Sequence, residues 1–234
     1  MNAMKILSGI LLAALVLGCG GCAGAPEEPV STLLFAPGDG GSKYYRIPAL
    51  VTADDGSLVA VADRRLESMG DLPNKIDLVA RRSTDGGRTW SSVIPIAEHR
   101  GDCGYGDAAL VSDARSGELL CIFASGRGLW ESTPEAPIDI NICRSGDFGQ
   151  TWSAPECITP QLWGAACANP LSRGWYGAFA ASGRALQLRD GTLLFVVAAR
   201  TGREAPPLVN YVCMSEDGGR SWRLLPTPVD MNGD

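Results

Sequence analysis

Histidine is almost absent from this sequence, which has His99 as its single example among 234 residues. None of the six cysteines that follow residue 30 stands at a zinc-ligand spacing from another of them or from His99, so we expect no metal site, and no motif indicates an organic cofactor. Basic residues are also few, 20 against 26 acidic residues, which gives a formal net charge of −6. This balance argues against nucleic acid as a partner, although local arginines could still bind a small anion.

Long apolar runs are missing as well. The main apolar stretch, residues 6–17, is too short for an ordinary membrane-spanning helix. It follows the basic residue Lys5, and this combination is typical of an export signal. We therefore expect residues 1–18 to be a signal peptide of the lipoprotein type.

A candidate lipidation site ends this signal. Gly18-Cys19 resembles a bacterial lipobox, in which the cysteine is lipidated and becomes the new N-terminus. The preceding residues fit the box imperfectly, and Cys22 is a weaker candidate. Residues 19–30 would then form a tether. We expect an exported protein in the periplasm or at the outer membrane or cell surface, with membrane contact only through this anchor; plain secretion is the alternative.

Six further cysteines follow the tether, an even number that permits disulfides in an exported protein. Six thiols can pair in about 15 ways, so the sequence leaves the pairing open. Several of them lie in apolar stretches and could equally be buried free thiols. They are Cys103, Cys121, Cys143, Cys157, Cys167 and Cys213.

One eight-residue pattern occurs three times in the chain. Its template is S-x-D-x-G-x-[ST]-W, and it stands at residues 83–90, 145–152 and 215–222. The Asp can accept hydrogen bonds from the backbone N–H groups that follow it, and Gly adopts the positive φ of a tight turn. The Trp adds a large apolar ring to pack beneath the turn. We interpret these boxes as structural hairpin turns.

The boxes belong to a longer repeating unit. Shorter turns at residues 55–56, 116–117 and 190–191 separate apolar stretches that read as strands. Each unit is strand, plain turn, strand, loop, strand, box, strand, which predicts a four-stranded antiparallel sheet. Such a sheet is the blade of a β-propeller, although periodicity alone does not exclude a sandwich. The three predicted sheets cover residues 44–98, 105–160 and 178–230.

Arg46 lies within the apolar stretch 44–50, at the start of the first unit. An unpaired charge in such a strand is costly, so an anion should meet the guanidinium. A carboxylate can accept two parallel hydrogen bonds from it. The anion could be a ligand or, as the alternative, a local Asp or Glu.

Arg46-Ile47-Pro48 in the first unit, followed by the three boxes, resembles the exo-α-sialidase (neuraminidase) family over residues 31–234. The resemblance implies a six-bladed β-propeller, of which this chain would form about three blades as the N-terminal part. It also implies retaining hydrolysis of terminal sialic acids from oligosaccharides, glycoproteins or glycolipids. The nucleophile in sialidases is a Tyr.

The resemblance assigns roles to four residues. Arg46 would bind the sialic acid carboxylate, and Arg65 would be a second pocket arginine near the catalytic acid, with Arg64 as the alternative. Asp71 would be the acid/base, and Asp107 would contact polar groups of the sugar.

Three further residues are interpreted from their positions in the sequence. Trp130 and Phe179 could contact an acetamido or glycerol group, or could simply belong to the core. Asp77, which starts the strand after Asp71, is interpreted as structural.

In this family a Glu, two more carboxylate-binding arginines and the nucleophilic Tyr follow the third box. Tyr176 and Tyr211 do not match that Tyr, nor do Arg184 and Arg200 match those arginines. We therefore expect a chain that stops before this half and is inactive alone. The alternatives are a non-catalytic propeller that binds sialylated glycans or assists assembly, and a trans-sialidase or related keto-sugar-acid hydrolase.

Overall fold

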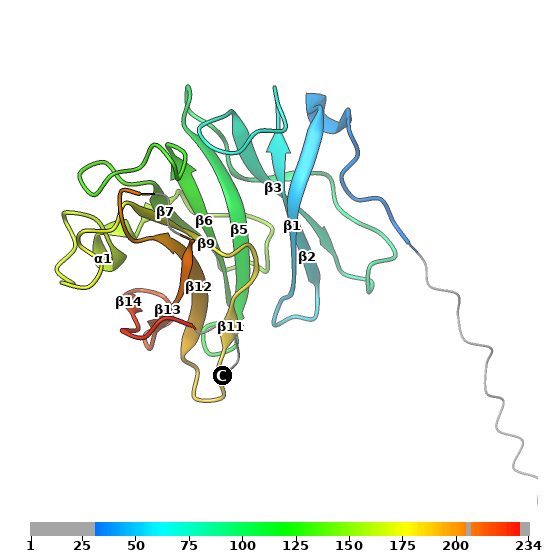
Figure 1. The fold of residues 1–234 in the computed structure, drawn as a ribbon. Coiled ribbons are helices and arrows are strands. Elements are labelled where there is room, and N and C mark those ends of the chain that lie inside the picture. Colours follow the sequence, from blue (N-terminus) through cyan, green and yellow to red (C-terminus); the bar gives the residue numbers. More distant parts are fainter. Residues whose placement is uncertain (1–30, 205–206, 230–234) are drawn as a thin grey trace, which may run out of the picture. The chain divides into compact units, whose positions relative to one another are not determined.

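The computed structural model describes residues 31–204 and 207–229 (Figure 1). The predicted signal peptide, the lipidation site Cys19 and the tether lie outside these residues. Strands dominate the described part, whose helical structure consists of α1 (Thr159–Leu162) and a 3-10 turn at Asp39–Gly41. The all-β fold expected from the sequence is confirmed. No described helix is long and apolar enough to cross a membrane.

The first sheet is a simple antiparallel meander with strand order β1-β2-β3-β4. The plain turn at residues 55–56 joins its first two strands, and the first box joins its last two. Its strands are β1 (Tyr44–Thr52), β2 (Leu58–Arg65), β3 (Ile76–Ser83) and β4 (Ile94–Ala97).

The second and third sheets repeat this order. β10 (Gly183–Arg184) adds to the second sheet, parallel to β5. In the third sheet β9 and β11 both pair with β12, so the first strand of that unit is interrupted. The second sheet contains β5 (Gly104–Asp113), β6 (Glu118–Gly126), β7 (Asp139–Ser145) and β8 (Glu156–Cys157). The third contains β9 (Gly177–Ala180), β11 (Leu186–Gln187), β12 (Leu193–Arg200), β13 (Val209–Ser215) and β14 (Arg223–Leu224).

The three boxes are cross-linked turns. Asp85 accepts a hydrogen bond from the Ser83 hydroxyl (2.8 Å) and two from Thr89, through its backbone N–H (2.9 Å) and its hydroxyl (2.6 Å). Asp147 and Asp217 make the same contacts in their boxes. The bonds from Thr89 lower the pKa of Asp85 to about 2. These carboxylates are occupied by their own turns, as a structural role requires.

An arginine immediately before each of the first two boxes reaches the box of the following sheet. Arg82 Nε donates to the Phe148 carbonyl at 2.9 Å, and Arg144 Nη1 donates to the Gly218 carbonyl at 3.1 Å. Met214 occupies the same position before the third box. The two arginines therefore link the second box to the first sheet and the third box to the second sheet.

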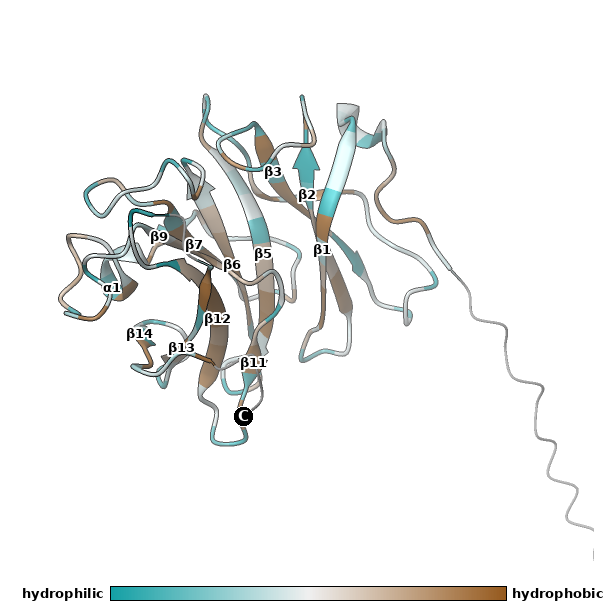
Figure 2. Ribbon diagram, viewed as in Figure 1, coloured by the Kyte–Doolittle hydropathy of each residue, from teal (hydrophilic) through white to brown (hydrophobic). Residues whose placement is uncertain are grey.

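Two apolar cores lie between the sheets, and Figure 2 shows hydrophobic (brown) stretches along strands of these sheets. Val61 and Leu78 of the first sheet pack in one core with Phe123 of the second. Ile122 of the second sheet and Val197 of the third pack in the other. The second sheet is thus buried on both faces. In β12 buried and half-buried residues alternate along most of the strand, so the face of the third sheet away from the second is less covered.

Candidate active site

Three of the four predicted site residues line one cavity of about 400 Å³. Arg46 comes from β1, Asp71 from the β2–β3 loop and Asp107 from β5. Arg65 of β2 is only 1% exposed and lies beneath, where it holds Asp71. All three sheets meet here, because Phe179 of β9 also lines the cavity.

Matching irregularities in β1 and β5 shape this cavity. The strand register shifts between Arg46 and Ala49 in β1, and between Gly106 and Ala109 in β5. At these bulges Ile47 has φ 53° and Asp107 has φ 61°, a left-handed conformation that non-glycine residues rarely adopt. A β-bulge bends its strand and re-aims the neighbouring side chains. Neither bulge was predicted from the sequence.

The structure distinguishes between the two arginines that the sequence left open. Arg65 Nη1 donates to Asp71 Oδ1 at 2.7 Å and also to the Met69 carbonyl at 2.7 Å. Arg64 points to the opposite face of the strand and pairs with Asp77 at 2.6 Å. Asp77 is buried and is not among the residues that line this cavity, which agrees with a structural role.

Asp71 is the most exposed member of the cluster, since 70% of its side chain is accessible. Besides Arg65 it contacts Arg46, whose Nη1 lies 3.3 Å from Asp71 Oδ1. The Arg46 side chain is itself 39% exposed. The anion that meets Arg46 is thus a local Asp, and both partners remain open to a ligand.

Asp107 faces a less polar environment. Burial raises its pKa, and the nearby carboxylate of Asp71 raises it further, while Arg65 and Arg46 act in the opposite direction. In either protonation state this carboxyl offers hydrogen-bonding atoms to a polar ligand.

Sequence reasoning missed Asp63 as a member of this cluster. Its side chain is fully buried, and its Oδ2 accepts a hydrogen bond from Arg65 Nη2 at 2.9 Å. Burial and the carboxylate of Asp107 raise the pKa of Asp63 to about 7, against the effect of Arg65. The signal was available, because residues two apart in a strand share a face and Asp63 stands two before Arg65.

The other wall of the cavity is apolar. Trp130 lines it and is 62% exposed, so this residue does not belong to the core. The guanidinium of Arg200 lies 5.7 Å from the Trp130 ring centroid and donates to the Trp130 carbonyl at 3.0 Å. Phe179 is half-buried on the same wall. One cavity therefore combines charged groups with an aromatic wall.

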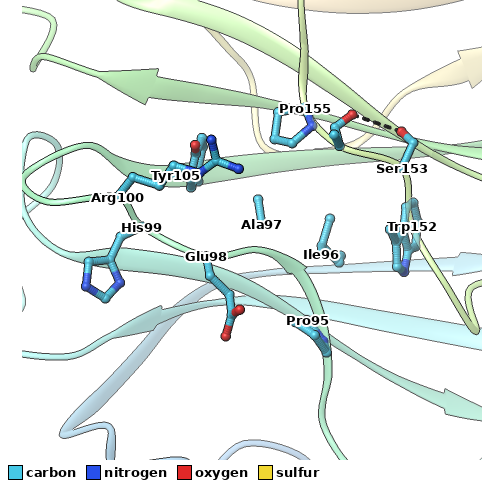
Figure 3. A pocket seen from close by; sticks show the side chains of 11 residues that line it. Pro95, Ile96, Ala97, Glu98, His99, Arg100, Tyr105, Trp152, Ser153 and Pro155 are labelled. Atoms are coloured by element: carbon cyan, nitrogen blue, oxygen red, sulfur yellow. Dashed lines mark hydrogen bonds between the residues drawn. The ribbon is translucent and has the colours of Figure 1, made fainter.

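A second cavity, of about 470 Å³, lies between β4 and the residues after the second box (Figure 3). Figure 3 shows Trp152 on one side of it and Tyr105 on the other. None of the predicted site residues lines it. Among the described residues, no group of three or more His, Cys, Asp and Glu side chains could hold a metal ion.

Sheets that each carry an Asp-containing turn between their last two strands, with a charged cavity where the sheets meet, define a class of repeat protein. Residues 47–229 match the model of the BNR repeat-like domain, and the chain belongs to that family. Within the family its resemblance to bacterial sialidases, predicted from the sequence, is confirmed by the following relatives.

A sialidase of Bacteroides fragilis is 32% identical over 80% of this chain and 36% of its own length. A sialidase of Micromonospora viridifaciens is 32% identical over 93% of this chain and 36% of its own. The solved structure of the Hadza microbial sialidase Hz136 is 31% identical, with a TM-score of 0.73 over 83% of this chain and 39% of its own. The chain thus spans about a third of the length of each of these two curated sialidases.

Proposed function

We propose that this chain supplies part of the active site of an exo-α-sialidase, which hydrolyses terminal sialic acids from glycoconjugates with retention. The observation that carries the proposal is the convergence of Arg46, Asp71 and Asp107 on one cavity, with Arg65 beneath. Strands of two sheets and one loop bring these residues together. The similarity to sialidases supports the same activity.

In the proposed complex, Arg46 binds the carboxylate of the sialic acid. Its guanidinium holds Asp71 through one long contact of 3.3 Å, so other N–H groups remain for a ligand. Asp107 contacts polar groups of the sugar from the neighbouring sheet. Trp130 and Phe179 take the apolar part of an acetamido or glycerol group on the opposite wall.

Asp71 is the proposed acid/base. It donates a proton to the glycosidic oxygen as the bond to the anomeric carbon breaks, and later removes a proton from the attacking water. Its exposure leaves the carboxyl accessible to the leaving group, and Arg65 fixes its position. The described residues that line the cavity include no Tyr and no Glu. In the proposed enzyme a Tyr nucleophile and its Glu base join them, as the sialidase resemblance implies.

The proposal also covers the surroundings of the site. The three sheets would be blades of a six-bladed propeller, with the cavity where the first strands of neighbouring blades meet. The enzyme would be exported and held at a membrane through lipidated Cys19, where it can reach extracellular glycans.

The test is turnover of a fluorogenic sialoside by the protein expressed from its full reading frame. We expect release of free sialic acid, and a loss of about 10²- to 10⁴-fold in kcat for Asp71→Asn. The control Asp54→Asn replaces an exposed Asp in the β1–β2 turn and should leave the rate unchanged. A wild-type protein that binds sialyllactose without cleaving it would contradict the proposal and favour the binding alternative.

A further inference from the structure

Asp63 connects two of the site residues, which come from different sheets. Its Oδ2 accepts from Arg65 Nη2 at 2.9 Å, and its Oδ1 accepts from the backbone N–H of Asp107 at 3.2 Å. The Asp63 side chain has no exposed surface, so water does not replace either contact. One buried carboxylate thereby joins β2 of the first sheet to the bulge of β5 in the second.

The residue before Asp107 leaves room for this carboxylate. A Cβ atom on Gly106 would lie 3.1 Å from Asp63 Oδ2, closer than such atoms normally approach. Asp107 in turn has the left-handed φ of 61°, a conformation that persists only where surrounding contacts hold it. The hydrogen bond from its N–H to Asp63 is such a contact.

We propose that Asp63 is a positioning residue of the active site, which holds Arg65 for its contact with Asp71 and holds the Asp107 peptide at the cavity wall. This inference deepens the proposed sialidase function and rests on it for the roles of Asp71 and Asp107. Asp63 itself does not line the cavity. It acts through the residues that it binds.

The charge of Asp63 also bears on Asp71. Arg65 lies between the two carboxylates, with Nη2 on Asp63 and Nη1 on Asp71. An ionised Asp63 neutralises part of the guanidinium charge and so weakens the stabilisation of ionised Asp71. Burial raises the pKa of Asp63 to about 7, so this effect changes within the neutral range. The charged and titratable groups around Asp63 are Arg46 from β1, Arg65 from β2, Asp71 from the loop, Asp107 from β5 and Cys121 from β6.

The first test is Asp63→Asn, which keeps the shape of the side chain but offers one acceptor oxygen in place of two. Since the bond from the charged Arg65 is the stronger of the two, the single oxygen should stay on Arg65, and the Asp107 N–H loses its acceptor. Asp71 also becomes the sole ion partner of Arg65. We expect kcat to fall at least about tenfold. We also expect the alkaline limb of the kcat/KM profile to move to lower pH, because the full guanidinium charge of Arg65 then acts on the proposed catalytic acid alone.

Asp77→Asn is the matched control. Asp77 is equally buried, pairs with Arg64 and accepts a backbone N–H from His99, but it lies on the opposite face of the first sheet. This variant should lose thermal stability without moving the alkaline limb. If both variants lose activity equally and neither moves the limb, Asp63 has only a structural role and the inference is wrong.

A second readout does not depend on turnover. Hydrogen exchange of the Asp107 backbone amide, measured by NMR, should accelerate at least about tenfold in Asp63→Asn and remain unchanged in Asp77→Asn. If the wild-type protein cleaves no sialoside, the proposed function fails, yet this exchange rate still decides whether Asp63 holds Asp107.

Gly106→Ala serves if Asp63→Asn does not fold, because it preserves the charge and pushes the carboxylate away by a few tenths of an ångström. It should also accelerate exchange of the Asp107 amide. Unchanged exchange in this variant would overturn the inference.

Discussion

At the scale of single residues, the contact between Arg46 and Asp71 joins two accessible side chains. Exposed ion pairs of this kind contribute about 0–1 kcal/mol to the free energy of unfolding. The pair therefore adds little to the stability of the fold, and its exposure leaves both groups free to exchange partners when a ligand enters.

We predict that Arg46→Ala changes the free energy of unfolding by less than about 1 kcal/mol. The same change should lower kcat/KM by roughly 10- to 100-fold, because it removes charged hydrogen bonds to the substrate carboxylate. Thermal denaturation and steady-state kinetics on a sialoside measure the two effects. A variant that melts much earlier but binds substrate normally would assign Arg46 to the fold.

Cysteine burial leads to a second prediction at this scale. All six described cysteines are free thiols; Cys157 is exposed and Cys103 is half-buried. Burial raises the pKa of the Cys143 thiol to about 12 and also raises the pKa of Cys121, so neither forms a reactive thiolate in the folded protein.

In the native protein a maleimide should therefore label Cys157 fastest, Cys103 more slowly and the buried cysteines only after denaturation. Mass spectrometry of labelled peptides measures this order. Two cysteines that resist labelling even in denaturant, but react after reduction, would reveal a disulfide.

Single residues also show how far sequence reasoning reaches. The boxes were predictable because Asp85 binds groups only two to four residues away. The choice between Arg64 and Arg65 was not, since it depends on which face of β2 lies toward the second sheet and the cavity. The place of Asp63 two residues before Arg65 could have been used to find it, but its contact with the Asp107 amide, 44 residues later in the chain, could not be predicted.

At the scale of elements, each box depends on an ionised Asp. The pKa of Asp85 falls from an unfolded value of 3.8 to about 2 in the folded turn. Its contribution to stability is therefore present above about pH 4 and is lost as the pH falls through 2. An Asn at this position carries no charge, so its contribution to the stability of the fold does not change over this pH range.

We predict that Asp85→Asn lowers the melting temperature near neutral pH, and that the gap to the wild-type protein closes as the pH falls from about 4 to about 2. Circular dichroism melting curves across this range provide the measurement. Asp54→Asn is the control, because Asp54 is exposed in a plain turn. An equal gap at every pH would mean that the box does not depend on the charge of Asp85.

The bulges are the elements that the sequence did not predict. The apolar stretch around Arg46 indicated a strand, and β1 confirms it, but a bulge depends on the register with β2. That register becomes visible only once the sheet is assembled. The alternation of apolar residues therefore predicted the strands of the fold but did not predict the shape of the cavity.

At the scale of the whole molecule, the central sheet and the third sheet differ in their coverage. Ile122 of β6 is fully buried between two sheets. Val196 stands at the equivalent position of β12, because both residues follow the second Leu of a Leu-Leu pair by two places. Val196 is nevertheless only half-buried. Apolar positions thus recur on a face that no described sheet covers.

We predict that the 234-residue chain, expressed alone, self-associates through this face and that Val196→Lys reduces the association. Analytical ultracentrifugation over a concentration series measures the effect. Ile122→Lys should instead unfold the protein, since it buries a charge without a partner. A wild-type chain that is monomeric at all concentrations would contradict the prediction.

The arginine links between boxes give the molecule a direction. Arg82 lies 66 residues before Phe148, whose carbonyl it binds, and Arg144 lies 74 residues before its acceptor Gly218. During synthesis the first and second sheets therefore each emerge with a donor whose acceptor the ribosome has not yet made. Its final locking waits for the box of its successor, so we expect the sheets to mature one after another from the N-terminus.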